Sequence, residues 1–265
     1  MRKGIGMKLF MRTMVGAAFV AALLLAGQTQ AATKLLEFDA AAAGAGNTPT
    51  SQGWTQFGSA MTNNGSFLLQ DNTGVGGEQS GEYLSPLLPV GTFVDGGSDY
   101  GIEFRTKPRT DVPFIGSAWG NMYLYWEDDQ WSYNVTIDLD PDDAGPVTTG
   151  SIVYGQGSFS PAITGIDWSV PHDIFIGYRS GAVFDFYLDG AIQSTVVSGS
   201  IARTRNGFAD NRVDFGDGTT AATDVAGEWH FVRVWDVNDP ALIPEPGTIC
   251  LMGLAALMML TRRRS

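Results

Sequence analysis

Residues 183–192 read Val183-Phe184-Asp185-Phe186-Tyr187-Leu188-Asp189-Gly190-Ala191-Ile192. An Asp-Gly pair stands here between two apolar runs. Asp-Gly tolerates the positive φ angles of a type I′ turn, and such two-residue turns join antiparallel strands. The stretch therefore predicts a β-hairpin whose turn is Asp189-Gly190.

Alternating segments of the same kind recur on both sides of this hairpin. Each is short, changes from apolar to polar with a period of two, and is bounded by Gly, Asp or Asn, which is typical of strands in an antiparallel sandwich. In the last of them, Trp229 and Phe231 are expected on one face and His230 on the other. No segment makes a convincing amphipathic helix, and residues 40–45 are expected to form a loop. The predicted strands are 101–105, 122–126, 133–139, 173–179, 183–188, 213–215 and 229–235.

Several short patterns in this region resemble a known fold family. They are Tyr-Leu-Asp-Gly at residues 187–190, the Val-Asp-Phe-Gly-Asp-Gly run at 213–218, and the closing strand at 227–234. Together they resemble laminin-G and concanavalin A-like domains. The resemblance implies an all-β, antiparallel jelly-roll sandwich over residues 32–240, and it supports the fold more than a function.

The charge of this region is strongly acidic. Of the 16 Lys and Arg residues, seven lie near the two ends of the chain, which leaves nine against 28 Asp and Glu, a balance close to −19. Nucleic acid is therefore not expected as a partner, because its phosphates would be repelled. The one cysteine, Cys250, lies near the C-terminus, so the domain is expected to use neither a disulfide nor a thiol nucleophile.

The N-terminal residues 1–31 have the pattern of a secretory signal peptide. A basic stretch is followed by an apolar run from Met14 to Ala26 and by small residues that end at Ala31. Translation could start at Met1 or at Met7. An uncleaved anchor helix is the alternative, but the apolar run is shorter than the ~20 residues that a stable span needs.

The C-terminal residues 241–265 have the pattern of a sorting tail. Pro244-Glu245-Pro246 precedes an apolar run over residues 249–260, and Arg262-Arg263-Arg264 follows it. The arginines are expected to stay on the cytoplasmic side of the inner membrane. This combination resembles the PEP-CTERM signal of Gram-negative bacteria, which implies exosortase as a partner, processing near Pro-Glu-Pro, and an association with exopolysaccharide or biofilm matrix. A plain membrane anchor is the alternative.

No catalytic motif stands out in the sequence. The Glu-x-Asp-x-x-Glu pattern of concanavalin A-like glucanases is absent, and Glu127-Asp128-Asp129 is interpreted as a turn between two strands. His172 and His230 are interpreted as structural, since no nucleophile elbow accompanies them. The chain is therefore predicted not to be an enzyme.

Two binding sites are nevertheless suggested. Four carboxylates in a loop, at Asp138, Asp140, Asp142 and Asp143, offer the hard oxygen ligands that calcium prefers. Trp126 and Trp131 flank a predicted loop, where an exposed ring could stack on a sugar. A solvated acidic loop and buried core tryptophans are the respective alternatives.

These patterns together predict an exported protein without catalytic activity. It would be held transiently in the inner membrane, sorted by exosortase to the cell surface or matrix, and in contact with extracellular polysaccharide. A glycan hydrolase or lyase on the same fold is one alternative, and a purely structural matrix protein is another.

Overall fold

A computed structural model describes residues 32–58, 60–71, 81–89, 91–93, 99–109, 122–127, 132–139, 149–154, 160–179, 183–197, 211–216 and 226–243. Nearly all of them belong to one unit, Thr33–Ala241. The second unit, Met1–Ala32 with Leu242–Ser265, lies almost wholly outside the described residues. The predicted signal peptide, Pro244-Glu245-Pro246 and the terminal arginines fall there. No helix among the described residues is long and apolar enough to cross a membrane.

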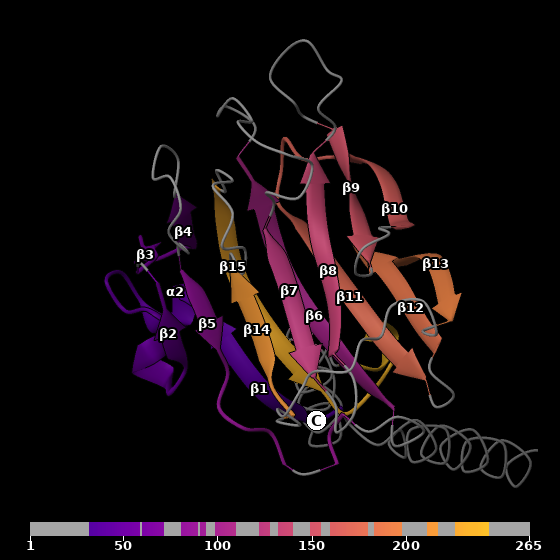
Figure 1. Ribbon diagram of the computed structural model, residues 1–265, viewed down its shortest axis with the longest axis horizontal. Coiled ribbons are helices and arrows are strands. Elements are labelled where there is room, and N and C mark those ends of the chain that lie inside the picture. The colour runs from indigo at the N-terminus through magenta and orange to yellow at the C-terminus, as the bar shows by residue number, and fades with distance from the viewer. Residues whose placement is uncertain are drawn as a thin grey trace, which may run out of the picture. The chain divides into compact units, whose positions relative to one another are not determined.

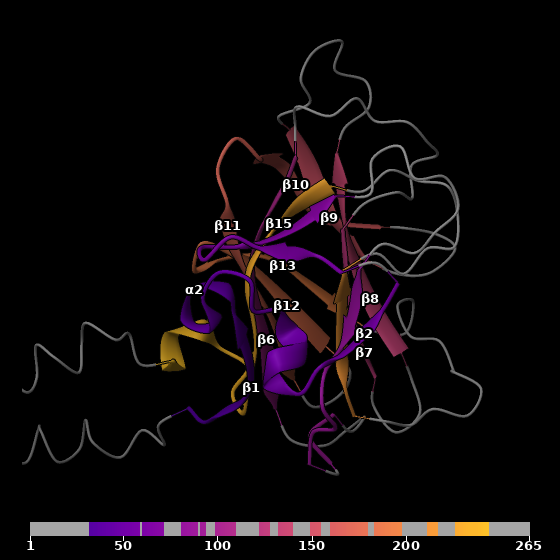
Figure 2. The same ribbon diagram turned by 90° about the vertical axis from the view of Figure 1, so that its left-hand side faces the viewer.

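The unit Thr33–Ala241 is built from two antiparallel β-sheets that pack face to face (Figures 1 and 2). The first, sheet A, has eight strands in the order β13-β12-β11-β6-β15-β4-β3, with β1 also paired to β15. Its strands are β1 (Lys34–Asp39), β3 (Thr62–Asn63), β4 (Leu68–Asp71), β6 (Tyr100–Pro108), β11 (His172–Arg179), β12 (Val183–Leu188), β13 (Ala191–Val197) and β15 (Ala226–Trp235).

The second, sheet B, has seven strands in the order β10-β9-β8-β7-β14-β5-β2. Both sheets contain only antiparallel pairs, which confirms the predicted all-β sandwich. The strands of sheet B are β2 (Thr55–Phe57), β5 (Glu82–Leu84), β7 (Tyr123–Glu127), β8 (Ser132–Leu139), β9 (Thr149–Tyr154), β10 (Ser160–Asp167) and β14 (Val213–Gly216).

The hairpin of β12 and β13 forms as predicted. Asp189 has φ 49° and Gly190 has φ 78°, the positive values that a type I′ turn requires. The turn is also tied to β11, since the Asp189 carboxylate accepts a hydrogen bond from the backbone N–H of Asp173 at 3.0 Å and lies 2.7 Å from His172 Nδ1. His172 thus helps to hold the turn against β11, and its Nε2 lies 2.7 Å from the carbonyl oxygen of Asp167.

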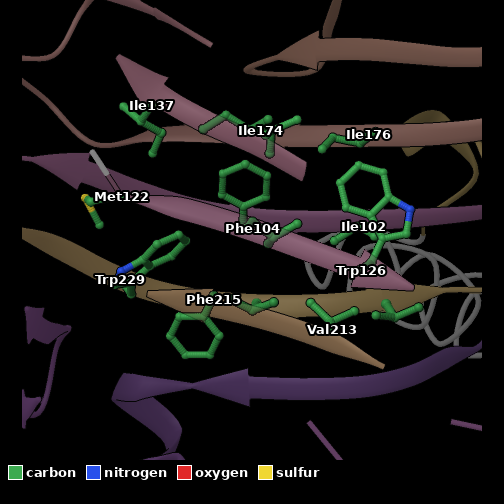
Figure 3. Packing of buried hydrophobic residues seen from close by; sticks show 14 of the residues in the cluster. Ile102, Phe104, Met122, Trp126, Ile137, Ile174, Ile176, Val213, Phe215 and Trp229 are labelled. Atoms are coloured by element: carbon green, nitrogen blue, oxygen red, sulfur yellow. The ribbon is translucent and has the colours of Figure 1, made fainter. Parts of the chain in front are cut away.

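The hydrophobic core fills the space between the sheets (Figure 3). Trp229 of sheet A is fully buried and packs against Phe104 of its own sheet and Phe215 of sheet B, with ring centroids 6.1 and 5.0 Å away. Its indole N–H donates to Gln70 Oε1 at 2.9 Å, so the polar atom of this large side chain is satisfied.

A β-bulge in β15 corrects one sequence-based expectation. Trp229 is paired with Thr106 and Phe231 with the next residue, Arg105, so His230 is an extra residue in its strand. Trp229 therefore faces the core, whereas Phe231 faces outward beneath the Arg233 guanidinium, 3.9 Å from its ring centroid. The prediction that Trp229 and Phe231 share a face is wrong, because the bulge breaks the period of two.

Two cross-strand glycines seat the chain that follows β15. Gly101 of β6 lies opposite Gly177 of β11, and together they form a strip without side chains of its own on the outer face of sheet A, here called the glycine furrow, which the ring of Phe175 covers in part at Gly101. A Cβ at Gly101 would lie 2.5 Å from the carbonyl oxygen of Val237, and one at Gly177 would lie 1.9 Å from that of Asn238. Only glycine admits this close approach of the backbone.

Short helical turns complete the unit. Residues 40–45, expected to form a loop, contain one turn of helix, α2 (Ala40–Ala43), and η1 (Pro49–Gln52) and η3 (Pro240–Leu242) are 3₁₀ turns. The carboxylate of Asp39 caps α2 by accepting the backbone N–H of Ala42 at 3.0 Å. The N-cap signal of Asp39 thus outweighs the following glycines for a single turn.

Candidate functional site

The outer face of sheet B carries an unusual set of buried polar side chains. Leu124 and Trp126 of β7 point into the core, as do Val213 and Phe215 of β14. Because successive side chains alternate between faces, Tyr125, Glu127 and Asp214 point away from the core. Their exposed fractions are 3%, 1% and 1%. This set is here called the sheet B polar face.

The register places the two carboxylates close to each other. Asp214 lies directly opposite Tyr125 on the neighbouring strand, and Glu127 lies two residues further along β7. Such diagonal neighbours are about 7–8 Å apart. A pair of carboxylates on one face of a sheet is the kind of group that acid–base chemistry on a glycosidic bond uses.

Neighbouring strands extend the polar face on both sides. Asn134 of β8 lies opposite Tyr125, and Thr136 lies opposite Tyr123. Tyr123 reaches across β14 and donates a hydrogen bond to Glu82 Oε1 of β5 at 3.0 Å. Aromatic rings, hydroxyls, an amide and carboxylates therefore occur together across four adjacent strands.

The predicted glycan contact at Trp126 is not supported. The side chain is 1% exposed, stacks on Tyr133 with ring centroids 5.5 Å apart, and donates its indole N–H to the Tyr100 hydroxyl at 3.0 Å. It is a core residue on the inner face of β7. Trp131 lies outside the described residues.

The predicted calcium ligands are only partly within the described residues. Asp138 belongs to β8, whereas Asp140, Asp142 and Asp143 fall in the segment 140–148, which is not described. Among the residues that are described, no group of three or more His, Cys, Asp or Glu could hold a metal ion. The calcium site remains a prediction.

The sequence alone does not reveal the sheet B polar face, although this face contains Glu127. Glu127 was assigned to a turn, yet it is the last residue of β7 and is buried. Asp214 was assigned only to a strand. The signal was the alternation itself, because a carboxylate next to an inward Trp126 or between inward Val213 and Phe215 must face outward.

Ionisable groups on the opposite sheet show the effect of burial. Burial raises the pKa of Glu103, and the indole N–H of Trp235 and the charge of Arg233 act against that rise. Burial also lowers the pKa of His230, with the nearby Glu228 acting in the opposite direction. Neither residue belongs to the sheet B polar face.

No protein-family model matches the chain, and neither does any curated protein. Solved structures, however, resemble the fold. A conserved carbohydrate esterase from the Shiga toxin-encoding bacteriophage phi24B superimposes with a TM-score of 0.51 at 14% identity, over 78% of this chain and all of the phage chain.

Two further structures are similar at lower scores. An endo-1,3-β-glucanase from Streptomyces sioyaensis has a TM-score of 0.45 at 11% identity, over 78% of this chain and 96% of its own. β-Agarase A from Zobellia galactanivorans has a TM-score of 0.46 at 13% identity, over 78% and 93% of the two chains.

These comparisons correct the prediction that the chain is not an enzyme. The structure that shares its fold at a TM-score of 0.51 is that of a carbohydrate esterase. The fold is therefore compatible with catalysis. Absence of a sequence motif was a poor guide, because carboxylates from β7 and β14 meet only in the folded sheet.

Proposed function

We propose that the protein is exported and contacts extracellular polysaccharide through the sheet B polar face. The observation that carries this proposal is the burial of Glu127 and Asp214 beside Tyr125 on the face turned away from the core. Buried carboxylates are costly unless a polar partner compensates them, so they are uncommon on a purely structural surface.

The chemistry of this face suits a carbohydrate. Tyrosine rings present an apolar surface to the C–H face of a sugar and a hydroxyl to its edge. The half-buried carboxylate of Glu82, which Tyr123 contacts, can accept hydrogen bonds from sugar hydroxyls, and charge-assisted hydrogen bonds of this kind are the stronger ones. The similarity to a carbohydrate esterase adds support for a fold used in carbohydrate chemistry.

Hydrolysis of the bound glycan is the second candidate function. It is favoured by the placement of Glu127 and Asp214 on adjacent strands and on the same face. One carboxyl would protonate the leaving oxygen, and the other would act as nucleophile or as base toward water. Both roles can be tested on the same preparation that is used for binding.

Replacing Tyr123 with alanine is expected to weaken glycan binding about fivefold, because a ring contact of about 1 kcal/mol is lost. Titration calorimetry against soluble laminarin, agaro-oligosaccharides and xylan would measure it. Tyr187→Ala, which removes a tyrosine from sheet A, is the matched control and should bind normally.

Release of reducing ends in the same mixtures reports hydrolysis, which Glu127→Gln or Asp214→Asn should abolish while binding persists. Failure of the unmodified protein to bind any of these polysaccharides, or equal weakening by Tyr123→Ala and Tyr187→Ala, would contradict the proposal.

The sorting of the protein is also part of the proposal. Pro244-Glu245-Pro246, the apolar run 249–260 and Arg262-Arg263-Arg264 support recognition by exosortase after export. Replacing the Pro-Glu-Pro triplet by alanines is expected to leave the unprocessed protein in the inner-membrane fraction, seen by immunoblotting. Normal processing of that variant would reduce the tail to an ordinary anchor.

A further inference from the structure

A cleft lies on the outer face of sheet A, away from the sheet B polar face. Its volume is about 440 Å³, within the range of small-ligand sites. Its floor is one cross-strand row in which Lys107 of β6 lies opposite Glu228 of β15, and Glu228 lies opposite Leu69 of β4. Thr62 of β3 continues the row.

The wall on the β6 side is basic. Lys107 and Arg109 both line the cleft, although residues 32–240 contain only nine Lys and Arg residues. Arg109 is held by Asp71, with Nη1 and Oδ2 2.7 Å apart. Lys107 is half-buried, and no carboxylate of the described residues lies within 4.0 Å of its ammonium group.

Lys107 differs in its lack of an ion pair from Lys34, the other lysine described in the same unit. Lys34 on β1 is exposed and forms an ion pair with Glu37. A half-buried ammonium group with no carboxylate within 4.0 Å is less fully neutralised than one in an ion pair, and partial burial reduces the screening of its charge by solvent. The cleft therefore presents a cation on a surface that is otherwise acidic.

The wall on the β3–β4 side is apolar and fixed. Phe67 is half-buried, and its ring is tilted against His230 with centroids 5.6 Å apart. The Oδ1 of Asn64 accepts the backbone N–H groups of Ser66 and Phe67 at 2.8 and 3.0 Å. These two hydrogen bonds fix the side-chain amide of Asn64. Its Nδ2 donates to no acceptor among the described residues and is available to a ligand.

We propose that this cleft binds a uronic acid residue of an acidic polysaccharide. The carboxylate of the sugar pairs with Lys107 at the basic wall, the sugar ring lies against Phe67, and a hydroxyl accepts the Nδ2 donor of Asn64. Glu228 lies 3.3 Å from His230 Nε2, and this contact draws the carboxylate toward the histidine side of the floor. The site is separate from the sheet B polar face and does not depend on its function.

Titration calorimetry of the full chain with tetragalacturonate at 50 mM NaCl tests the proposal, with fully methyl-esterified tetragalacturonate as the uncharged ligand. Lys107→Gln is expected to weaken binding of the acid about tenfold or more, which is the size of a charge-assisted hydrogen bond. The matched control Lys34→Gln removes the same charge from β1 and should bind as the unmodified protein does. Lys107→Gln should still bind laminarin or xylan as the unmodified protein does, which separates this site from the sheet B polar face.

Three results would overturn the proposal. They are equal affinity for the acid and its ester, equal weakening by Lys107→Gln and Lys34→Gln, and absence of binding by the unmodified protein. Thermal melting establishes that each variant is folded. Should Lys107→Gln not fold, the NMR signals of the Asn64 side-chain amide in the unmodified protein must shift on addition of the acid and not of the ester, and an unchanged signal rejects the site.

Discussion

Replacing Trp229 with alanine is expected to lower the free energy of unfolding by about 3–5 kcal/mol, the usual cost of removing a large buried aromatic side chain. Trp229 is fully buried, contacts rings from both sheets, and donates to Gln70. Its removal leaves a cavity between the sheets and a buried amide without its partner. Since the free energy of unfolding of a domain is usually only about 5–15 kcal/mol, this single substitution would remove a large part of the stability.

Urea denaturation followed by tyrosine and tryptophan fluorescence would measure the effect of Trp229→Ala. Trp235→Ala is the matched control, because Trp235 lies six residues later on the same strand but faces outward, where its indole N–H donates to Glu103 at 2.9 Å. Trp235→Ala should lower the free energy of unfolding by about 1 kcal/mol, the contribution of one hydrogen bond with some packing. Equal losses in the two variants would show that the space between the sheets is not the main source of stability.

Gly177→Ala should displace the segment that follows β15. A Cβ at this position would lie 1.9 Å from the carbonyl oxygen of Asn238 and 2.9 Å from its carbonyl carbon. Either β11 or the backbone at Asn238 must therefore move. Overpacking of this kind costs about 1–3 kcal/mol. Hydrogen exchange should show faster exchange of the backbone amides of residues 236–242 than in the unmodified protein.

Truncation supplies the control for Gly177→Ala. In a chain that ends at Asp236, the alanine meets no carbonyl oxygen, so the substitution should then cost much less than in the full chain. Gly190→Ala is a useful second comparison, since a Cβ there meets no atom within 4 Å. Its only expected cost in stability is the backbone strain of an alanine at a φ of 78°. An unchanged exchange pattern in Gly177→Ala would mean that the furrow does not hold the segment.

The fold could be predicted from the sequence where alternation is uninterrupted. The strands around Ile137, Phe175 and Phe186 were recognised because each places large apolar residues at every second position, and Asp189-Gly190 defined the hairpin turn. The strand β10 was missed because its register shifts twice, between Pro161 and Ile163 and again before Ile166. A bulge removes the periodic signal that identifies a strand.

The candidate site could be predicted much less well. The sequence points to tryptophans as sugar-binding residues, yet Trp126 fills the core. The residues that form the sheet B polar face come from β7, β8 and β14, which are far apart in sequence, and their proximity follows from strand order. A sequence shows which side chains face outward, but it does not show which strands become neighbours.

The glycine furrow has a mechanical consequence. Tension applied at the C-terminal end of the unit would first lift Val237 and Asn238 off the two glycines and would then act along the axis of β15. This strand is bonded to β6 along most of its length and to β1 and β4. Hydrogen bonds of an antiparallel pair run perpendicular to the strands, so a pull along β15 strains many of them together. If the protein were held at a surface by this end, its most extensively paired strand would resist shear. The residues that lie on the glycine furrow would detach and extend before that strand is loaded.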